Sequence, residues 1–375
     1  MANTLTNLIP ELYTNLDVVS RELVGMIPAV TLDAVATRAA KDQTVRVFNA
    51  PASSAGDISP GVTPPNDGDQ TFTNVSVSIT KARRVPIRWN GEEELAVGPG
   101  AAAMRGAQIQ QAIRTLVNEI ESDLAGLHQY ASRAAGTAGT TPFGTANDYT
   151  AASLTRKILV DNGSPTSDMH LIIDTAAGAN IRGKQSGATD AGSDSILRQG
   201  VLLDINGMTI RESAQIKLPA IGTVTGTLAS AVRAKGVTVL TTTADYSATL
   251  LPGDIVTFAG DTNQYVITSV SASAITIGAP GLVDGTTTGT KAITVVAAAR
   301  RNMAFTRNAI VLAQRLPALP SGGDLAADRT SITDPRSGLS FEVAMYPQYR
   351  QMQYEISCAW GVKVIKPEHL ALLLG

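Results

Sequence analysis

The sequence is poor in cysteine, aromatic residues and charge. Cys358 is the one cysteine among 375 residues, so no internal disulfide can form. That fits a chain made in a reducing cytoplasm, and it excludes a zinc site built from several cysteines. Aromatic residues make up 4% and charged residues 17% of the chain, and the formal net charge is −2. This composition offers no basic field for binding nucleic acid and no acidic excess typical of disordered chains.

Signals for membranes and secretion are missing as well. No apolar run approaches the ~18 residues that are needed to span a bilayer. The chain does not open with a basic segment followed by an apolar run, which is the pattern of a secretory signal. We therefore expect neither a secretory signal nor a membrane partner.

Motifs for catalysis are also missing. The sequence contains neither the G-x-S-x-G nucleophile elbow nor the G-x-x-x-x-G-K-[ST] phosphate loop. His128, His170 and His369 lie far apart in the sequence, and none has a second ligand residue at metal-binding spacing. Structural roles are therefore favoured for all three histidines.

Three further reactive side chains also favour structural interpretations. Asp190 and Asp194 lie in a Gly/Ser-rich stretch that indicates a solvated loop, because Ca²⁺ requires six or more oxygen ligands. Cys358 follows a strand pattern next to Trp360, with no histidine suggested as its partner, which favours a buried residue over a nucleophile. We predict that the protein is not an enzyme and has no catalytic, cofactor-binding or metal-binding residues.

A long helix is predicted over 99–135, between Gly98-Pro99-Gly100 and Gly136. At ~1.5 Å per residue it would be roughly 50 Å long. Such a length suits either an ordinary core helix or a beam in a protein that spans distance. Its apolar residues recur at steps of three and four, and polar residues occupy the other face. The apolar stripe is Ile109, Ile113, Leu116, Val117, Ile120, Leu124 and Leu127, and the polar face is Gln108, Gln111, Arg114, Asn118, Glu121 and Ser122.

A two-stranded flap is predicted upstream of this helix. Residues 44–50 and 71–80 alternate as strands do, and 51–70 are rich in Pro, Gly, Asp, Asn and Ser. A lone ribbon is marginal in water and is stabilised when it lies across another surface. An amphipathic helix is also predicted at 9–24, and it packs either on its own domain or on a neighbouring subunit.

Two short charged runs lie between the flap and the long helix. Lys81, Arg83 and Arg84 are basic, and Glu92 to Glu94 are acidic. These runs are interpreted either as solvated faces or as complementary patches between copies of the chain.

The rest of the chain divides into an α+β part and an all-β part. Turn residues separate short apolar runs throughout 218–299, which predicts a small barrel or sandwich inserted into the α+β unit. Helices are expected at 150–161, 175–183 and 307–314, and strands at 170–174, 339–346 and 352–365. A hairpin is expected at 201–205 and 208–211 around Asn206-Gly207. The strands expected in the all-β part are 223–227, 237–241, 255–258, 265–270, 274–277 and 292–296.

This order of elements resembles that of the major capsid proteins of tailed bacteriophages. The resemblance is greatest to the short-tailed-phage coat proteins that carry an inserted β-barrel domain. It covers essentially the whole chain and rests on element order and local patterns. The residues that carry it are Met1-Ala2-Asn3-Thr4-Leu5, the flap at 51–70, the helix at 99–135, the run Arg301 to Ile310, and the segment Tyr354 to Ile365.

The resemblance implies an α+β fold of the Hong Kong type with an inserted all-β domain. The implied division is 1–40 as N-terminal arm, 41–80 as extended β-loop, 81–136 as peripheral domain with the long spine helix, 137–217 as the first part of the axial domain, 218–299 as the inserted all-β domain, 300–335 as the second part of the axial domain, and 336–375 as the C-terminal strands of the peripheral domain.

The same resemblance implies a structural protein that assembles, as pentamers and hexamers, into the icosahedral shell of a tailed bacteriophage. Such a shell encloses double-stranded DNA without sequence-specific binding and is assembled in the host bacterial cytoplasm. A portal and a separate scaffolding protein are implied partners, because 1–40 is too short for the long scaffolding region of some relatives. Some relatives crosslink a flap lysine to the next subunit, but 51–70 contains no lysine.

Two other functions compete with a capsid role. One is another virion or tail structural protein, although tubes and fibres have no need of a long helix with an upstream flap. The other is a carbohydrate-binding or hydrolytic protein whose all-β part is active. That part has few aromatic residues, among them Tyr246, Phe258 and Tyr265, and no obvious pair of catalytic carboxylates.

Overall fold

The computed structural model describes most of the chain. The predicted helix at 9–24, apart from Val24, lies outside the described residues, as do Asp190 and Asp194. The described residues are 24–49, 55–58, 60–63, 68–97, 101–145, 148–184, 202, 204–223, 225–231, 233–285, 289–333 and 338–375.

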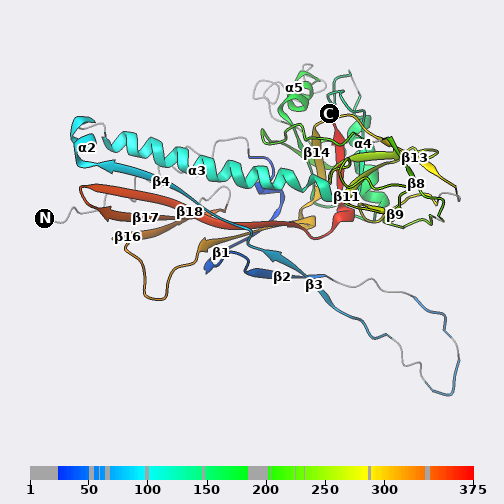
Figure 1. Ribbon diagram of the computed structural model, residues 1–375, viewed down its shortest axis with the longest axis horizontal. Coiled ribbons are helices and arrows are strands. Elements are labelled where there is room, and N and C mark those ends of the chain that lie inside the picture. Colours follow the sequence, from blue (N-terminus) through cyan, green and yellow to red (C-terminus); the bar gives the residue numbers. More distant parts are fainter. Residues whose placement is uncertain are drawn as a thin grey trace.

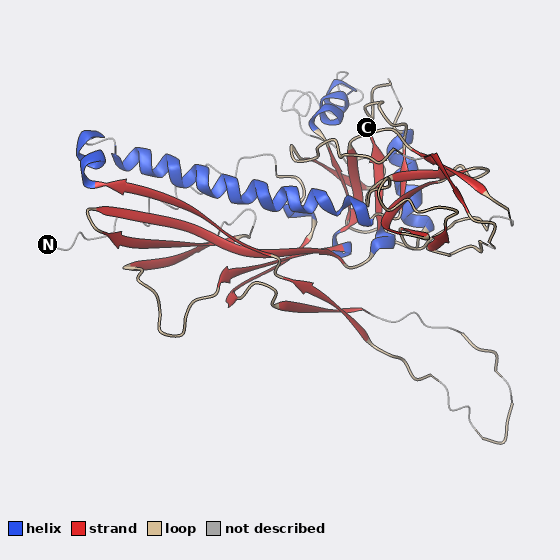
Figure 2. Ribbon diagram, viewed as in Figure 1, coloured by secondary structure: helices blue, strands red, loops and turns tan. Residues whose placement is uncertain are grey.

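The described chain combines one long α-helix with many strands and a few short helices, of which those labelled η are 3-10 helices (Figures 1 and 2). The mixed α+β class that the sequence predicts is therefore confirmed. In chain order the elements are η2 (Ile27–Ala29), β1 (Thr31–Ala39), β2 (Thr44–Asn49), β3 (Thr73–Ser78), β4 (Lys81–Asn90), α2 (Gly91–Val97), α3 (Ala101–Ala125), η4 (Gly126–Tyr130), β5 (Arg133–Ala135), α4 (Thr150–Asp161), β6 (Met169–Ile173), α5 (Thr175–Lys184), β7 (Met208–Glu212), β8 (Thr225–Leu228), β9 (Val239–Thr241), β10 (Ile255–Phe258), β11 (Gln264–Ser271), β12 (Ala274–Ile277), β13 (Lys291–Val295), β14 (Arg301–Thr306), η5 (Arg307–Ala309), β15 (Ile310–Pro317), β16 (Asp328–Thr333), β17 (Ser340–Gln348), β18 (Gln351–Val364), η6 (Pro367–His369) and β19 (Leu370–Leu374).

The long helix α3 lies along a sheet of long strands (Figure 1). Within the described residues this long-strand sheet has the order β1-β15-β18-β17-β16, with β4 on the other side of β18. Two tryptophans tie the helix to the sheet: the indole Nε1 of Trp89 donates to Gln108 and that of Trp360 donates to Asp123, at 2.7 and 2.8 Å. All seven residues of the predicted apolar stripe are buried, which confirms the predicted helix face.

The helix is shorter than the sequence predicts. Its 25 residues end at Ala125, so at ~1.5 Å per residue it is roughly 37 Å long. At Gly126 the α-helix gives way to the 3-10 helix η4. Strand β5 follows and pairs with both β11 and β19. The small apolar residues of this stretch suit a buried strand as well as a helix, and sheet pairing decides between them.

A second, mixed sheet gathers strands from distant parts of the sequence. Its order in the described chain is β7-β6-β14-β19-β5-β11-β10-β13-β8, with β12 and β9 attached through β11. The C-terminal strand β19 lies inside this sheet, antiparallel to β14 and parallel to β5. Helix α4 packs against β19 and β5.

In the described part of the predicted all-β stretch there are six strands, β8 to β13. These strands enclose their own cluster of buried side chains, in which Phe258 stacks on Tyr265 at 5.5 Å between ring centroids. Strand β11 also pairs with β5, so the stretch continues the mixed sheet rather than standing apart from it. The division of the chain into domains stays a prediction.

One predicted helix is wrong, and one predicted hairpin is confirmed only at its turn. The helix expected at 307–314 is instead η5 followed by strand β15, in which Ile310 to Gln314 are all buried. A strand covered on both faces shows no alternation and is easily mistaken for a helix. The turn at Asn206-Gly207 is present, with positive φ at both residues, and an antiparallel bridge joins Ile205 to Met208. Strand β7 also pairs in parallel with β6, and residues 201 and 203 of the expected upstream strand lie outside the described residues.

Candidate interaction surface

The flap is an antiparallel ribbon of β2 and β3 that leaves the body of the protein (Figure 1). Its pairing runs from Thr44 opposite Ser78 to Asn49 opposite Thr73, which confirms the two predicted flap strands. Large apolar side chains on the ribbon and on the described parts of its loop face solvent. Several large apolar side chains left in water on one projecting segment make that segment a candidate interaction surface. Phe48 and Phe72 are 85% and 75% exposed, and Ile58 and Val62 are fully exposed.

The root of the flap, by contrast, is firmly packed. Val77 and Ile79 are fully buried against Ala313 and Ala359 of the long-strand sheet. At Gly361 of β18, an added Cβ would lie 1.9 Å from the carbonyl oxygen of Ser78, so the two backbones touch. The flap is therefore held rigidly at its base, while its apolar side chains Phe48 and Phe72 stay largely exposed to solvent.

The flap is also acidic. From the start of β2 to residue 80 the charged residues are Arg46, Asp57, Asp67 and Asp69, so the net charge is negative, and there is no lysine. An apolar, negatively charged surface fits a partner surface that is apolar and carries positive charge.

The basic run before the helix is paired within the chain. The neighbouring carboxylates lie on α3 and β18, and the side chains of Arg83 and Arg84 remain 57% and 59% exposed, so the run is a solvated face whose charges are paired within the chain. Burial alone would lower the pKa of Lys81, but hydrogen bonds and charges from Asp123 and Glu119 raise that pKa above its ordinary value. The ion pairs are Lys81–Asp123 at 2.8 Å, Lys81–Glu119 at 3.0 Å, Arg83–Glu119 at 3.2 Å and Arg84–Glu355 at 2.7 Å.

A buried carboxylate holds the chain just after residue 23. Glu121 of α3 is 1% exposed and accepts backbone N–H bonds from Gly25, Met26 and Ile27 at 2.8, 2.7 and 3.1 Å. An added Cβ at Gly25 would lie 2.6 Å from the carbonyl oxygen of Glu212, so this segment is closely fitted. Glu121 therefore anchors the base of the N-terminal segment, although the sequence places it on the polar face of the helix.

The anchor has a predictable pH dependence. Burial raises the pKa of Glu121 above its ordinary value of 4.5, and hydrogen bonds from Met26, Ser213 and the neighbouring backbone offset part of the rise. A raised folded-state pKa means that the folded chain holds this proton more tightly than the unfolded chain. The stability that comes from this tighter proton binding is complete below pH 4.5 and is lost as the pH rises through the folded-state pKa, whereas the hydrogen bonds to the backbone remain.

Relative to Glu121→Gln, which does not titrate, the wild-type chain should gain free energy of unfolding as the pH falls from 7 towards 4.5. Urea unfolding of both proteins at several pH values in this range measures the difference. A wild-type chain that loses stability relative to the variant as the pH falls would contradict the expected sign.

The residues considered for catalysis occupy structural positions. Burial lowers the pKa of His128, His170 and His369, which lie in η4, β6 and η6. Cys358 is fully buried in β18, where burial raises the pKa of its thiol, so the reactive thiolate is suppressed. In the described part of the chain, no group of three or more His, Cys, Asp or Glu residues is arranged to hold a metal ion. Among the same residues, no helix combines the length and apolar character needed to cross a bilayer.

No protein-family model matches the chain, and no curated protein matches it. Several solved structures are similar in fold at low identity. The capsid of cyanophage P-SCSP1u has a TM-score of 0.49 at 12% identity, over 92% of this chain and 86% of that one. The capsid of Myoviridae phage XM1 has a TM-score of 0.46 at 10% identity, over 94% and 92%. A structure from Mycobacterium phage Che8 has a TM-score of 0.44 at 12% identity, over 88% and 84%. At these identities and TM-scores the similarity concerns the fold alone and not the function.

Proposed function

We propose that the chain is the major capsid protein of a tailed bacteriophage, a structural subunit that assembles with copies of itself into a closed shell. The observation that carries the proposal is the flap. It is fixed at its root by Val77, Ile79 and the close contact at Gly361, yet its end exposes Phe48 and Phe72 to solvent. We expect a neighbouring molecule to cover an apolar surface that its own chain leaves exposed.

The remaining architecture supports this role. The helix α3, tied to the long-strand sheet by Trp89 and Trp360, forms a stiff body from which the flap projects (Figure 2). Many weak contacts, each made by a flap on a neighbour, add up to a stable lattice through multivalency. We propose the division into arm, extended loop, peripheral, axial and inserted parts that the sequence resemblance implies, with two changes: β15 and β16 belong with the long-strand sheet, and β19 belongs with the mixed sheet.

We further propose that a scaffolding protein and a portal take part in assembly in the host cytoplasm, and that the shell encloses double-stranded DNA. The formal net charge of −2 suits a shell that holds DNA without fixed phosphate contacts, because each such contact strengthens binding and makes it dependent on salt.

Removing residues 56–66 tests the proposal. The deletion takes away the exposed apolar side chains of Ile58 and Val62 but leaves the packed root intact, so a folded chain that assembles poorly is expected. Sedimentation velocity with and without a candidate scaffold, followed by electron microscopy of any fast fraction, measures assembly.

Normal shells from the deletion variant would contradict the role of the flap. A wild-type chain that stays monomeric under every condition would contradict the capsid proposal itself. The thermal midpoint of the monomer serves as the control for folding.

A further inference from the structure

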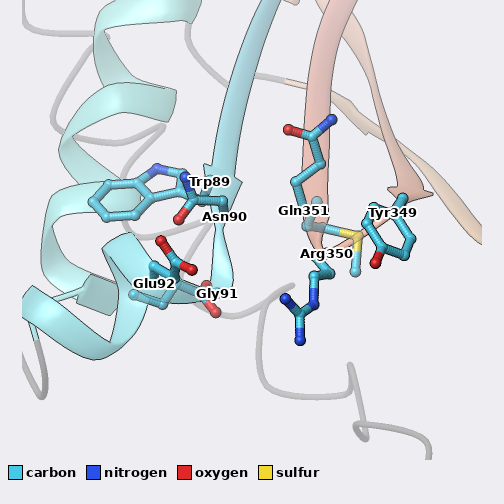
Figure 3. A pocket seen from close by; sticks show the side chains of 9 residues that line it. Trp89, Asn90, Gly91, Glu92, Tyr349, Arg350 and Gln351 are labelled. Atoms are coloured by element: carbon cyan, nitrogen blue, oxygen red, sulfur yellow. The ribbon is translucent and has the colours of Figure 1, made fainter.

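The end of the long-strand sheet that carries α2 has an open hollow of about 650 Å³ (Figure 3). We call it the tip hollow. One wall comes from the end of β4 and the start of α2, and the other from the turn between β17 and β18 and the first residues of β18. Its lining residues are Trp89, Asn90, Gly91, Glu92, Glu94, Tyr349, Arg350, Gln351 and Met352.

The two walls carry opposite charges that have no side-chain partner among the described residues. Glu92 and Arg350 are both exposed, and neither makes an ion pair or a side-chain hydrogen bond with any residue that the structure describes. The other two acidic residues of α2 are engaged, since Glu93 accepts the backbone N–H of Asn90 at 3.0 Å and Glu94 pairs with Arg105. The tip hollow therefore has one free negative charge and one free positive charge on facing walls.

The basic wall is held in a costly backbone conformation. Gln348 pairs with Gln351, so Tyr349 and Arg350 form a two-residue turn. Arg350 has a φ of +56°, a region that glycine and asparagine enter much more readily than arginine. Residues held in such conformations gather at functional sites, and here the strained position presents a charged side chain at the apex of the turn. Its neighbour Tyr349 is 89% exposed.

We propose that the tip hollow is a contact site for a second copy of this chain, in which Arg350 of one copy pairs with Glu92 of the other and Tyr349 packs into the hollow. The inference rests on the proposed capsid function and names one contact of the shell. Tyrosine, tryptophan and arginine are the residues most enriched among those that dominate interface energetics, and all three line the tip hollow.

A second copy is the occupant that the charges favour. Each tip hollow has one unpaired carboxylate, Glu92, and one unpaired guanidinium, Arg350. Two copies of the chain can therefore pair these charges with each other and need no other molecule. A two-fold contact and a closed ring both bring the Glu92 of one copy to the Arg350 of another. Exposed ion pairs of this kind add little affinity and mainly fix the orientation of the partners. A contact at the end of the long-strand sheet would in this way set the angle between neighbouring copies.

Charge reversal tests the contact. Glu92→Arg and Arg350→Glu, made singly, place like charges against each other, so each should reduce the yield of shells by about tenfold relative to wild type. The double variant restores opposite charges and should return the yield to about that of wild type. Sedimentation velocity of the shell fraction, under the conditions in which the wild-type chain assembles, measures all four proteins.

Arg350→Gly is the matched control for folding. Glycine adopts positive φ without strain, so this variant should keep or raise the thermal midpoint of the monomer while it loses shell yield. Single reversals that assemble as well as wild type, or a double variant no better than the singles, would overturn the tip contact and leave the capsid proposal standing. A wild-type chain that forms no shells would instead overturn the capsid proposal.

A crosslink identifies the two residues directly. Cys358 is buried and is the only natural cysteine, so new surface cysteines are the accessible thiols. Chains with Glu92→Cys and chains with Arg350→Cys, assembled together and oxidised, should form disulfide-linked dimers, whereas either chain assembled alone should form few. Equal crosslinking in the single-variant and mixed assemblies would count against the pairing of these two residues.

Discussion

Replacing Glu121 with alanine should lower the free energy of unfolding by about 3–5 kcal/mol, because three buried backbone N–H groups lose their acceptor at once. The carboxylate is 1% exposed, and its donors, Gly25, Met26 and Ile27, are buried beside it, so water cannot easily replace it. Urea denaturation of the unassembled chain, followed by circular dichroism, measures the loss.

Glu119→Ala is the matched control for this prediction. Glu119 lies on the same helix and also carries a carboxylate, but its side chain is 30% exposed and its partners are Lys81 and Arg83 on the surface. Exposed ion pairs contribute less than about 1 kcal/mol, so this variant should remain close to wild type. If both alanine variants lost the same free energy, the anchoring role of Glu121 would be refuted.

Gly361→Ala is expected to displace the flap from its root. The new Cβ would lie 1.9 Å from the Ser78 carbonyl oxygen and 2.8 Å from its carbonyl carbon, and neither backbone can move cheaply. Overpacking of this kind costs about 1–3 kcal/mol, and the strained root should also reduce assembly. Denaturant unfolding measures the first effect and sedimentation velocity the second.

Gly126→Ala provides the comparison for Gly361→Ala. Nothing lies within 4 Å of a Cβ added at Gly126, which directly follows α3. Alanine there should leave both stability and assembly nearly unchanged. A Gly361→Ala protein that matches the Gly126→Ala protein in both measurements would show that the flap root tolerates a side chain.

The sequence predicted the parts of the fold whose signals are local. The apolar steps from Ile109 to Leu127 identified the buried face of α3, and alternation on either side of 51–70 identified the flap strands. In the all-β stretch, turn residues bounded each apolar run, so the ranges predicted at 255–258 and 274–277 coincide with β10 and β12. These patterns depend on neighbours in the chain, which a sequence displays directly.

The anchor could not be predicted in the same way, because it depends on contacts between distant residues. Glu121 was assigned to the polar face of α3, yet it contacts residues more than 90 positions earlier in the chain. One signal was available: Glu121 follows Val117 by four residues and precedes Leu124 by three, so it borders the apolar stripe.

The tip hollow and strand β15 could not be predicted from the sequence, again because they depend on contacts between distant residues. The acidic run at Glu92 to Glu94 was noticed, but its facing charge, Arg350, is about 250 positions away and became a neighbour only through the pairing of β4 with β18. In β15, tertiary contacts cover both faces of the strand, and this removed the alternation that would have distinguished it from a helix.

The position of β19 has a consequence for how the protein is made. Residues 370–374 pair with β14 on one side and with β5 on the other, so a strand from the end of the chain joins the middle of the mixed sheet. While a ribosome is still translating the preceding residues, β14 and β5 have no strand between them, and their facing edges remain unpaired. Unpaired strand edges favour aggregation, and contacts between distant residues form slowly. The mixed sheet can close only after translation reaches Leu374, so the chain cannot complete this sheet while its last strand is still being made.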